Sequence, residues 1–279
     1  SYFLAICTSV ASRVLSWKER LLSSGGKLVL IWSILASMPI HILVASNPPR
    51  GVFVMLEQIF ADFLWGSSEV GPQFHWIKWS QLCKPYEEGG VGIRSLQHVF
   101  DAFSLKLWWN FRLRRSLWAE FMHLKYCPEV HPCFSNFLPG HSHTWKRMVH
   151  AQVVAEKHIC WSLGSGSSSF WHDNWLRTGP LCRQVESFQE HSVADFVMEG
   201  RWDLQSLSRV LSPGWVQQVL GVAPLTTAKA DEMIWAPTNS GEFTISSAYQ
   251  IVRNEGNVSD MFISLWHRAL SSKISFFML

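Results

Sequence analysis

Apolar residues recur at three- and four-residue steps through the first part of the chain. This spacing predicts helical structure over 9–37, with a break at Gly25-Gly26 and an end at Pro39, because proline cannot continue a helix. A second stripe over 52–63 is opposed by polar residues, and Gly66 follows it as a stop signal. This stripe predicts the clearest amphipathic helix in the chain.

A third apolar stripe predicts a long helix that starts at about Leu96 and has a basic C-terminal end. The preceding segment, 76–92, is aromatic and glycine-rich, which predicts a strand and turn. The pattern breaks down over 128–139, where we expect a loop.

Alternating residues over 159–175 predict a β-hairpin, and the runs at 233–235 and 243–245 predict a second one. Short helices are expected over 203–211 and 246–253. The predicted fold class is therefore mainly α with small β-hairpins, an α+β protein.

The composition supports a folded core. The chain has 279 residues, of which 48% are hydrophobic and 14% aromatic, and this is far from a disordered composition. Sixteen tryptophans exceed ordinary usage, and such large rings bury much area. The first core candidates among them are Trp17, Trp65, Trp79, Trp108 and Trp118.

The net charge of +3 is unevenly distributed. Residues 13–115 hold 12 Lys/Arg against 7 Asp/Glu, whereas residues 183–279 hold 7 against 10. The first segment is thus the better candidate for a nucleic-acid surface, although an ordinary solvated surface would have the same composition. The candidate nucleic-acid-binding residues are Lys27, Arg94, Lys106, Arg112, Arg114 and Arg115.

Cysteine usage and the absence of a basic leader predict reduced thiols in a nuclear or cytoplasmic protein that is not secreted. The uncharged stretch 28–49 is long enough to span a bilayer. Polar residues and Pro39 interrupt it, so we expect a buried helix and loop and no membrane partner.

The sequence offers candidates for a polymerase centre and for a zinc site. A polymerase needs paired carboxylates that hold two metals, and the adjacent acids here, Glu87-Glu88 and Asp231-Glu232, lack the aromatic context of such a pair. Cys127, His131 and Cys133 offer zinc ligands, but their spacing matches no standard finger. We therefore predict no enzyme activity for the chain itself and no metal site.

The loop Gly164–Ser169 superficially resembles a phosphate-binding loop but lacks the Gly-Lys-Ser/Thr that enters a helix, so a β-turn is favoured. His172 and Asp173 suggest a hydrolase with a serine of 165–169, but no third partner is evident. Asp173 is instead expected to order the turn between Trp171 and Trp175 by accepting hydrogen bonds from nearby backbone amides.

A series of tryptophan and glycine landmarks runs through the chain in fixed order. Leu22–Lys27, Phe63–Gly66, Trp79–Pro85, Gly89–Arg94, Trp161–Gly166 and Phe170–Trp175 together resemble the region after the polymerase active site of plant LINE-type (non-LTR) retrotransposon reverse transcriptases. Asp231–Leu279 looks like the start of the reverse-transcriptase zinc-binding domain. The structural positions in these motifs are Trp65, Gly66, Trp79, Gly89, Gly90, Gly92, Trp161, Gly164, Gly166, Trp171, Asp173 and Trp175.

This chain departs from the family's pattern at several points. Lys27 stands where the family usually has Arg, which keeps the charge but not the bidentate geometry. The Pro of the family's last segment is absent near Ser271, and the family's zinc ligands would lie beyond Leu279. The resemblance therefore implies no cofactor in this chain, with magnesium used by the polymerase centre of the parent protein.

The resemblance implies a helical thumb and post-thumb region over 1–127, an irregular connection with a Trp/Gly-rich hairpin over 128–230, and a truncated zinc-binding module over 231–279. It further implies a non-catalytic fragment of an RNA-directed DNA polymerase that retains at most binding of an RNA/DNA template-primer. The alternative is a protein-interaction or structural remnant that self-associates through exposed apolar surface and has no nucleic-acid role.

Overall fold

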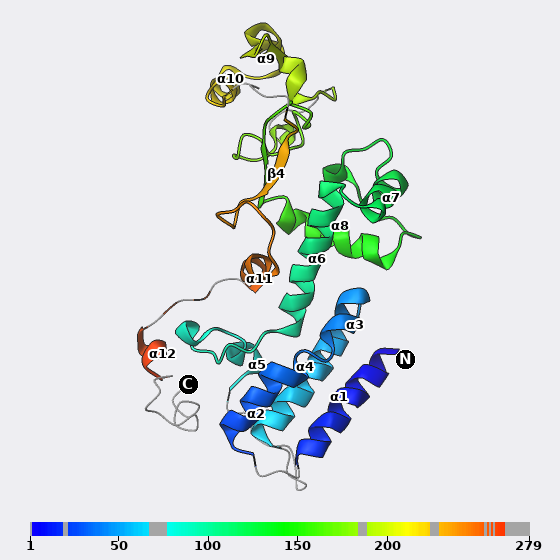
Figure 1. Cartoon of the computed structure of the whole chain (residues 1–279), viewed down its shortest axis with the longest axis vertical. Helices are drawn as coiled ribbons and strands as arrows, with labels where there is room; N and C mark the ends of the chain where they lie inside the picture. The colour runs from blue at the N-terminus through cyan, green and yellow to red at the C-terminus, as the bar shows by residue number, and fades with distance from the viewer. Residues whose placement is uncertain are drawn as a thin grey trace. The chain divides into compact units, whose positions relative to one another are not determined.

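A computed structural model shows a mainly helical protein with two small antiparallel sheets, as the sequence predicts (Figure 1). Its internal contacts divide it into unit 1, residues 1–103 and 249–279, and unit 2, residues 104–248. This division does not test the three segments inferred from resemblance, which stay a prediction. The structure describes residues 2–18, 22–66, 77–183, 189–223, 229–253, 256, 258 and 260–265.

Unit 1 begins with helices that pack around α4, as Figure 1 shows in blue and cyan. The predicted break at Gly25-Gly26 is wrong, because both glycines lie inside a helix that starts one residue earlier. Ser23 caps that helix by accepting a hydrogen bond from the Gly26 amide at 3.2 Å. The elements are α1 (Tyr2–Lys18), α2 (Ser24–Leu30), the π-helical turn η1 (Ile31–Leu35), α3 (Ile40–Ala45) and α4 (Arg50–Trp65).

The predicted amphipathic helix is confirmed as α4. Its apolar stripe, including Leu56, Phe60 and Phe63, is almost wholly buried against the other helices. Each such side chain contributes roughly 1.5–3 kcal/mol by leaving water. Gly66 ends the helix with a φ of 91°, which a side chain would disfavour.

The strand expected within 76–92 is wrong for residues 77–92, and Trp76 lies outside the described residues. This segment curls into α5 (Trp79–Leu82) and the 3-10 helix η2 (Tyr86–Glu88). Its backbone groups bond to one another, as in the 2.8 Å bond from Gly90 N to Pro85 O, so no extended partner is needed. Of the predicted strand and turn, only the turn is present in residues 77–92.

The long helix is confirmed as α6 (Leu96–Leu113). Two further helices, α7 (Leu117–Tyr126) and α8 (His143–Ala155), were not predicted from spacing. Residues 128–139 contain only the 3-10 helix η3 (Pro132–Phe134), so the expected loop is confirmed.

The strands of unit 2 pair over long range. β1 (Ile159–Ser162) pairs antiparallel with β4 (Glu232–Trp235), in a register that matches Ile159 with Trp235. Both predicted local hairpins are therefore wrong, although the Trp235 amide does donate to Gly241 O at 2.7 Å. Alternation correctly placed strands at 159–162 and 233–235, but 163–175 and 243–245 form no strand, and the pattern could not identify the partner of either real strand.

The rest of unit 2 packs around an aromatic core. Phe170 lies 4.1 Å from Phe196, and Trp175 stacks on Trp202 at 5.7 Å between ring centroids. Two expected helices are confirmed as α9 (Leu204–Val210) in unit 2 and α11 (Ile245–Arg253), which runs from unit 2 into unit 1. The other elements are η4 (Leu181–Arg183), η5 (Val193–Phe196), β2 (Val197–Met198), β3 (Arg201–Trp202), α10 (Pro213–Leu220) and, in unit 1, α12 (Asp260–Leu265).

All six cysteines are free thiols. Within the described ranges, none of the helices combines the length and apolar character needed to cross a membrane.

Replacing Gly90 with alanine tests how tightly the turn of unit 1 is packed. A Cβ at this position would lie 1.9 Å from Lys84 O, so the backbone must shift, and we expect a loss of about 1–3 kcal/mol in the free energy of unfolding. Gly51→Ala is the matched control, because its Cβ would meet no atom within 4 Å and an exposed helical alanine should stabilise by about 0.5 kcal/mol. Urea unfolding of both variants measures this. Equal effects of the two substitutions would contradict the packing argument.

Candidate functional site

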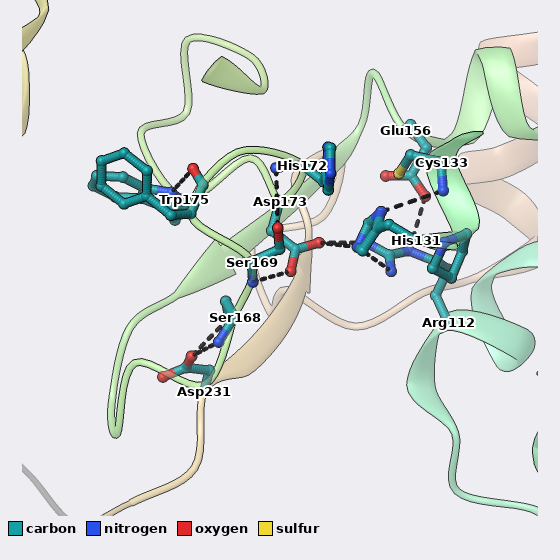
Figure 2. A network of polar contacts seen from close by, with 12 residues as sticks. Arg112, His131, Cys133, Glu156, Ser168, Ser169, His172, Asp173, Trp175 and Asp231 are labelled. Carbon is teal, nitrogen blue, oxygen red and sulfur yellow. Dashed lines mark hydrogen bonds and ion pairs between the residues drawn. The ribbon is translucent and has the colours of Figure 1, made fainter. Parts of the chain in front are cut away.

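The most connected polar site of unit 2 is built on Arg112, near the C-terminal end of α6. Arg112 is only 8% exposed, and its guanidinium points toward two carboxylates (Figure 2). Nε lies 2.9 Å from Glu156 Oε1, and one terminal nitrogen lies 2.5 Å from Asp173 Oδ1. The basic end predicted for this helix is therefore not solvated as a whole: Arg112 is an internal cation.

Glu156 follows the last turn of α8 and serves as its C-cap residue. The Oε1 atom that meets Arg112 also accepts a 2.7 Å hydrogen bond from the indole Nε1 of Trp108, one turn earlier on α6. One carboxylate thus fixes two successive turns of α6 against the end of α8.

Asp173 comes from the loop between β1 and the aromatic core. Its Oδ2 accepts a 2.9 Å hydrogen bond from the Ser169 amide, so Asp173 does bind a nearby backbone amide, although the segment it closes is 169–173 and not the expected turn between Trp171 and Trp175. Its other oxygen pairs with Arg112, and this second role was not predicted. The signal was present in the spacing, because Arg112 lies four residues after the buried Trp108 and so on the inner side of α6.

The charges of this group sustain one another. Burial alone would raise the pKa of Asp173, but Arg112 and the hydrogen bond from His131 together more than offset it, and the pKa of the carboxyl lies well below its usual range. Burial likewise would lower the pKa of Arg112, and the charges of Glu156 and Asp173 raise it instead. The pair therefore remains ionised throughout the physiological range.

Two histidines stack beside the ion pair. The rings of His131 and His172 are 4.8 Å apart, and His131 Nε2 lies 3.4 Å from Asp173 Oδ1. His131 Nδ1 accepts from the Cys133 amide at 3.3 Å, which places the ring proton on Nε2. Burial lowers the pKa of His131, so we assign it the neutral form.

The structure does not form the hydrolase site that His172, Asp173 and a serine of 165–169 suggest. His172 Nε2 lies 2.9 Å from Glu190 Oε1, and its ring packs against Phe134. The hydroxyl of Ser169 accepts from the His172 backbone amide, so it is not placed as a nucleophile on that imidazole.

The side chains of Cys127, His131 and Cys133 are not gathered into one group of ligands. Among the residues that the structure describes, no group of three or more His, Cys, Asp or Glu side chains is close enough to hold an ion. His131 is committed to Asp173, and burial raises the pKa of both thiols.

The loop that follows β1 wraps around a carboxylate of its own chain. Asp231 accepts hydrogen bonds from the amides of Gly164 at 2.6 Å, Gly166 at 2.9 Å and Ser168 at 2.6 Å, and from the Ser168 hydroxyl at 2.6 Å. These amides come from alternate residues and converge on one carboxylate, so the loop forms an anion-binding nest. The nest is thus filled internally, in keeping with the turn favoured over a nucleotide site.

The landmark glycines of this loop have a steric cause. A Cβ at Gly164 would lie 2.2 Å from Lys229 O, and Gly166 has a φ of 77°. Burial would raise the pKa of Asp231, but its hydrogen bonds, first that of Ser168, lower it.

The landmark tryptophans mostly hold loops. Trp175 Nε1 donates to Phe170 O at 2.9 Å, Trp171 Nε1 lies 3.3 Å from His191 Nδ1, and the Trp161 ring lies under Arg112 at 5.6 Å. In unit 1, Trp65 and Trp79 are half-buried against the helical core. Trp118, expected in the core, is instead exposed on α7.

The predicted nucleic-acid-binding residues lie in different settings. In unit 1, Arg94 is exposed, and Lys27 is half-buried with Nζ 3.4 Å from Leu64 O at the end of α4. In unit 2, Lys106, Arg114 and Arg115 are exposed, whereas Arg112 is not. Arg114 also lines a cavity of about 430 Å³ together with Arg112, His123, His131, Trp161 and Asp173.

Comparison with known proteins finds a similar protein of known sequence. Over 293 aligned residues, 99% of the chain is 27% identical to an Arabidopsis thaliana protein named "Putative ribonuclease H protein At1g65750". The chain spans 47% of that protein's length. No protein-family model matches the chain. No solved structure matches it either.

Removing the buried cation should cost far more than removing its exposed neighbour. Arg112→Ala leaves the buried carboxylate of Asp173 and the half-buried carboxylate of Glu156 without their partner, and we expect a loss of about 3–5 kcal/mol in the free energy of unfolding. Arg114→Ala, a change at an exposed position, should stay within about 0.5 kcal/mol. Urea titrations followed by tryptophan fluorescence compare the two. Similar small losses would show that the pair is dispensable.

Acidification should destabilise the protein in part through the neutral His131. Because the folded-state pKa of His131 lies below its ordinary value of 6.5, the unfolded chain binds more protons as the pH falls past 6.5. Stability should therefore decline from that point down to the lowered pKa. His131→Gln should reduce the slope of stability against pH by at most about 1.4 kcal/mol per pH unit. The exposed His150→Gln variant is the control, and an unchanged slope in His131→Gln would contradict the assignment.

Proposed function

We propose that this chain is a non-catalytic, nucleic-acid-binding segment of a retroelement-derived protein of the reverse-transcriptase type. Two observations support this proposal. The ordered tryptophan and glycine motifs resemble a retroelement reverse transcriptase, and the similar Arabidopsis protein carries the name of a ribonuclease. A reverse transcriptase and a ribonuclease both act on nucleic acid, so an RNA/DNA template-primer is the ligand we favour.

The internal use of the acidic groups supports a non-catalytic role. Asp173 and Glu156 are held by Arg112, Asp231 is held by the 164–168 loop, and Glu88 in unit 1 is held by Arg253 at 2.8 Å. A two-metal centre needs carboxylates that are free to face substrate. In this proposal, polymerase chemistry belongs to other parts of the parent protein.

The observation that carries the binding proposal is the exposure of cations around the end of α6. Lys106, Arg114 and Arg115 are exposed, while the fourth cation, Arg112, is fully engaged inside unit 2. Solvent-exposed Lys and Arg bind nucleic acid mainly through backbone phosphates, largely independent of sequence. The exposed ring of Trp118 follows directly and offers a surface on which an unpaired base can stack.

A salt series tests this proposal. Fluorescence anisotropy of a labelled RNA–DNA primer-template should show binding that weakens steeply as salt rises, because phosphate contacts release counterions. The triple variant Lys106→Ala/Arg114→Ala/Arg115→Ala should bind much more weakly and lose up to about three units of the salt slope.

The matched control removes two exposed arginines of the same unit, Arg201→Ala/Arg209→Ala, and should bind nearly as the parent does. Absence of binding by the folded parent chain would refute the nucleic-acid role. Association that holds or strengthens with salt would favour the protein-interaction alternative.

A further inference from the structure

Helix α7 exposes an apolar stripe on the surface of unit 2. Leu117 is 87% exposed, Phe121 57% and Leu124 66%. The opposite side of the same helix is buried through Ala119 and Met122. α7 is therefore apolar on both sides, and only one of them is covered by its own unit.

The exposed stripe has the spacing of a coiled-coil seam. Leu117, Phe121 and Leu124 are separated by four and then three residues, as the d, a and d positions of a heptad are. With that assignment, Glu120 takes the g position and Lys125 the following e position. Both charges are exposed, one on each flank of the stripe.

The two charged flanks select a partner and a direction. In a parallel pair of helices, each g residue lies beside the e residue five positions later on the other helix. Glu120 would then face Lys125 of a second copy, twice over by symmetry. An antiparallel pair would instead bring each Glu120 beside its own equivalent, which is repulsive.

We propose that two copies of this chain associate through α7, with the helices parallel about a two-fold axis. The contact is isologous: the Leu117–Phe121–Leu124 stripes pack together, and two Glu120–Lys125 pairs border them. Lys125 already lies along the edge of the stripe, since its Nζ is 5.6 Å from the centroid of the Phe121 ring. Its stem can cover that ring while its charge meets the second copy.

The size of the seam sets the strength of this contact. α7 has ten residues and three seam positions, so the contact falls below the roughly 1,200–2,000 Å² buried by a stable standard interface. We therefore expect a reversible dimer whose population rises with protein concentration rather than a permanent one.

Charge reversal tests the register. In sedimentation velocity runs over a concentration series, Glu120→Lys alone and Lys125→Glu alone should each weaken dimerisation about tenfold, because both bordering pairs become repulsive. An equimolar mixture of the two variants should associate at least as well as the parent, because every border then joins opposite charges. In an antiparallel contact the parent already carries like charges at both borders, so neither single variant would weaken it. Loss of association in both single variants together with its recovery in the mixture is therefore the result expected of the parallel register.

Apolar substitutions complete the experiment. Phe121→Ser/Leu124→Ser should abolish the dimer, whereas Val153→Ser, which is 65% exposed on α8, should leave it unchanged. Circular dichroism checks that each variant is folded. A parent chain that stays monomeric at every concentration overturns the proposal, and so does a mixture of charge variants that stays as weakly associated as either variant alone.

Discussion

The ion pair of Arg112 with two carboxylates is the constraint on which unit 2 depends. It joins three segments that are distant in sequence: the end of α6, the cap of α8 and the loop at Asp173. A buried pair of this kind contributes little beyond what apolar side chains would contribute, but each charge is costly without its partner. Its effect is therefore specificity, since alternative packings of these loops would leave a charge buried alone.

A similar arrangement holds two other irregular segments that the structure describes. Asp231 collects amides of the 164–168 loop, and in unit 1 Glu88 accepts from Arg253 and from the Gly256 amide at 3.0 Å. Four-residue strands cannot hold such long loops by themselves. A carboxylate that accepts several hydrogen bonds takes the place of the backbone hydrogen bonds that longer strands would supply. The loop must then pass close to other backbone, and the motif glycines stand at these close approaches.

Periodicity predicted those elements whose stability comes from one apolar face. α4 and α6 were found in this way, and Gly66 was correctly identified as a stop. The pairing of β1 with β4 was not, because alternation marks a strand without naming its partner. Periodicity did not predict α8, because its buried face includes Arg147, a cation that donates to the Ser104 hydroxyl and interrupts the apolar stripe.

The candidate site was harder to predict than the fold, because arginine occurs there both as a buried partner of carboxylates and as an exposed cation. Arg112 and Arg114 stand two positions apart in a basic run, and composition treats them alike. Helical spacing separates them: Arg112 follows Trp108 onto the buried side, and Arg114 leaves the helix with a φ of 50° and faces solvent. Once buried charges are satisfied internally, recognition is left to the exposed ones. Screening by salt then acts mainly on those exposed charges, because buried pairs are screened far less. Dependence on ionic strength therefore separates what this protein binds from what holds it together.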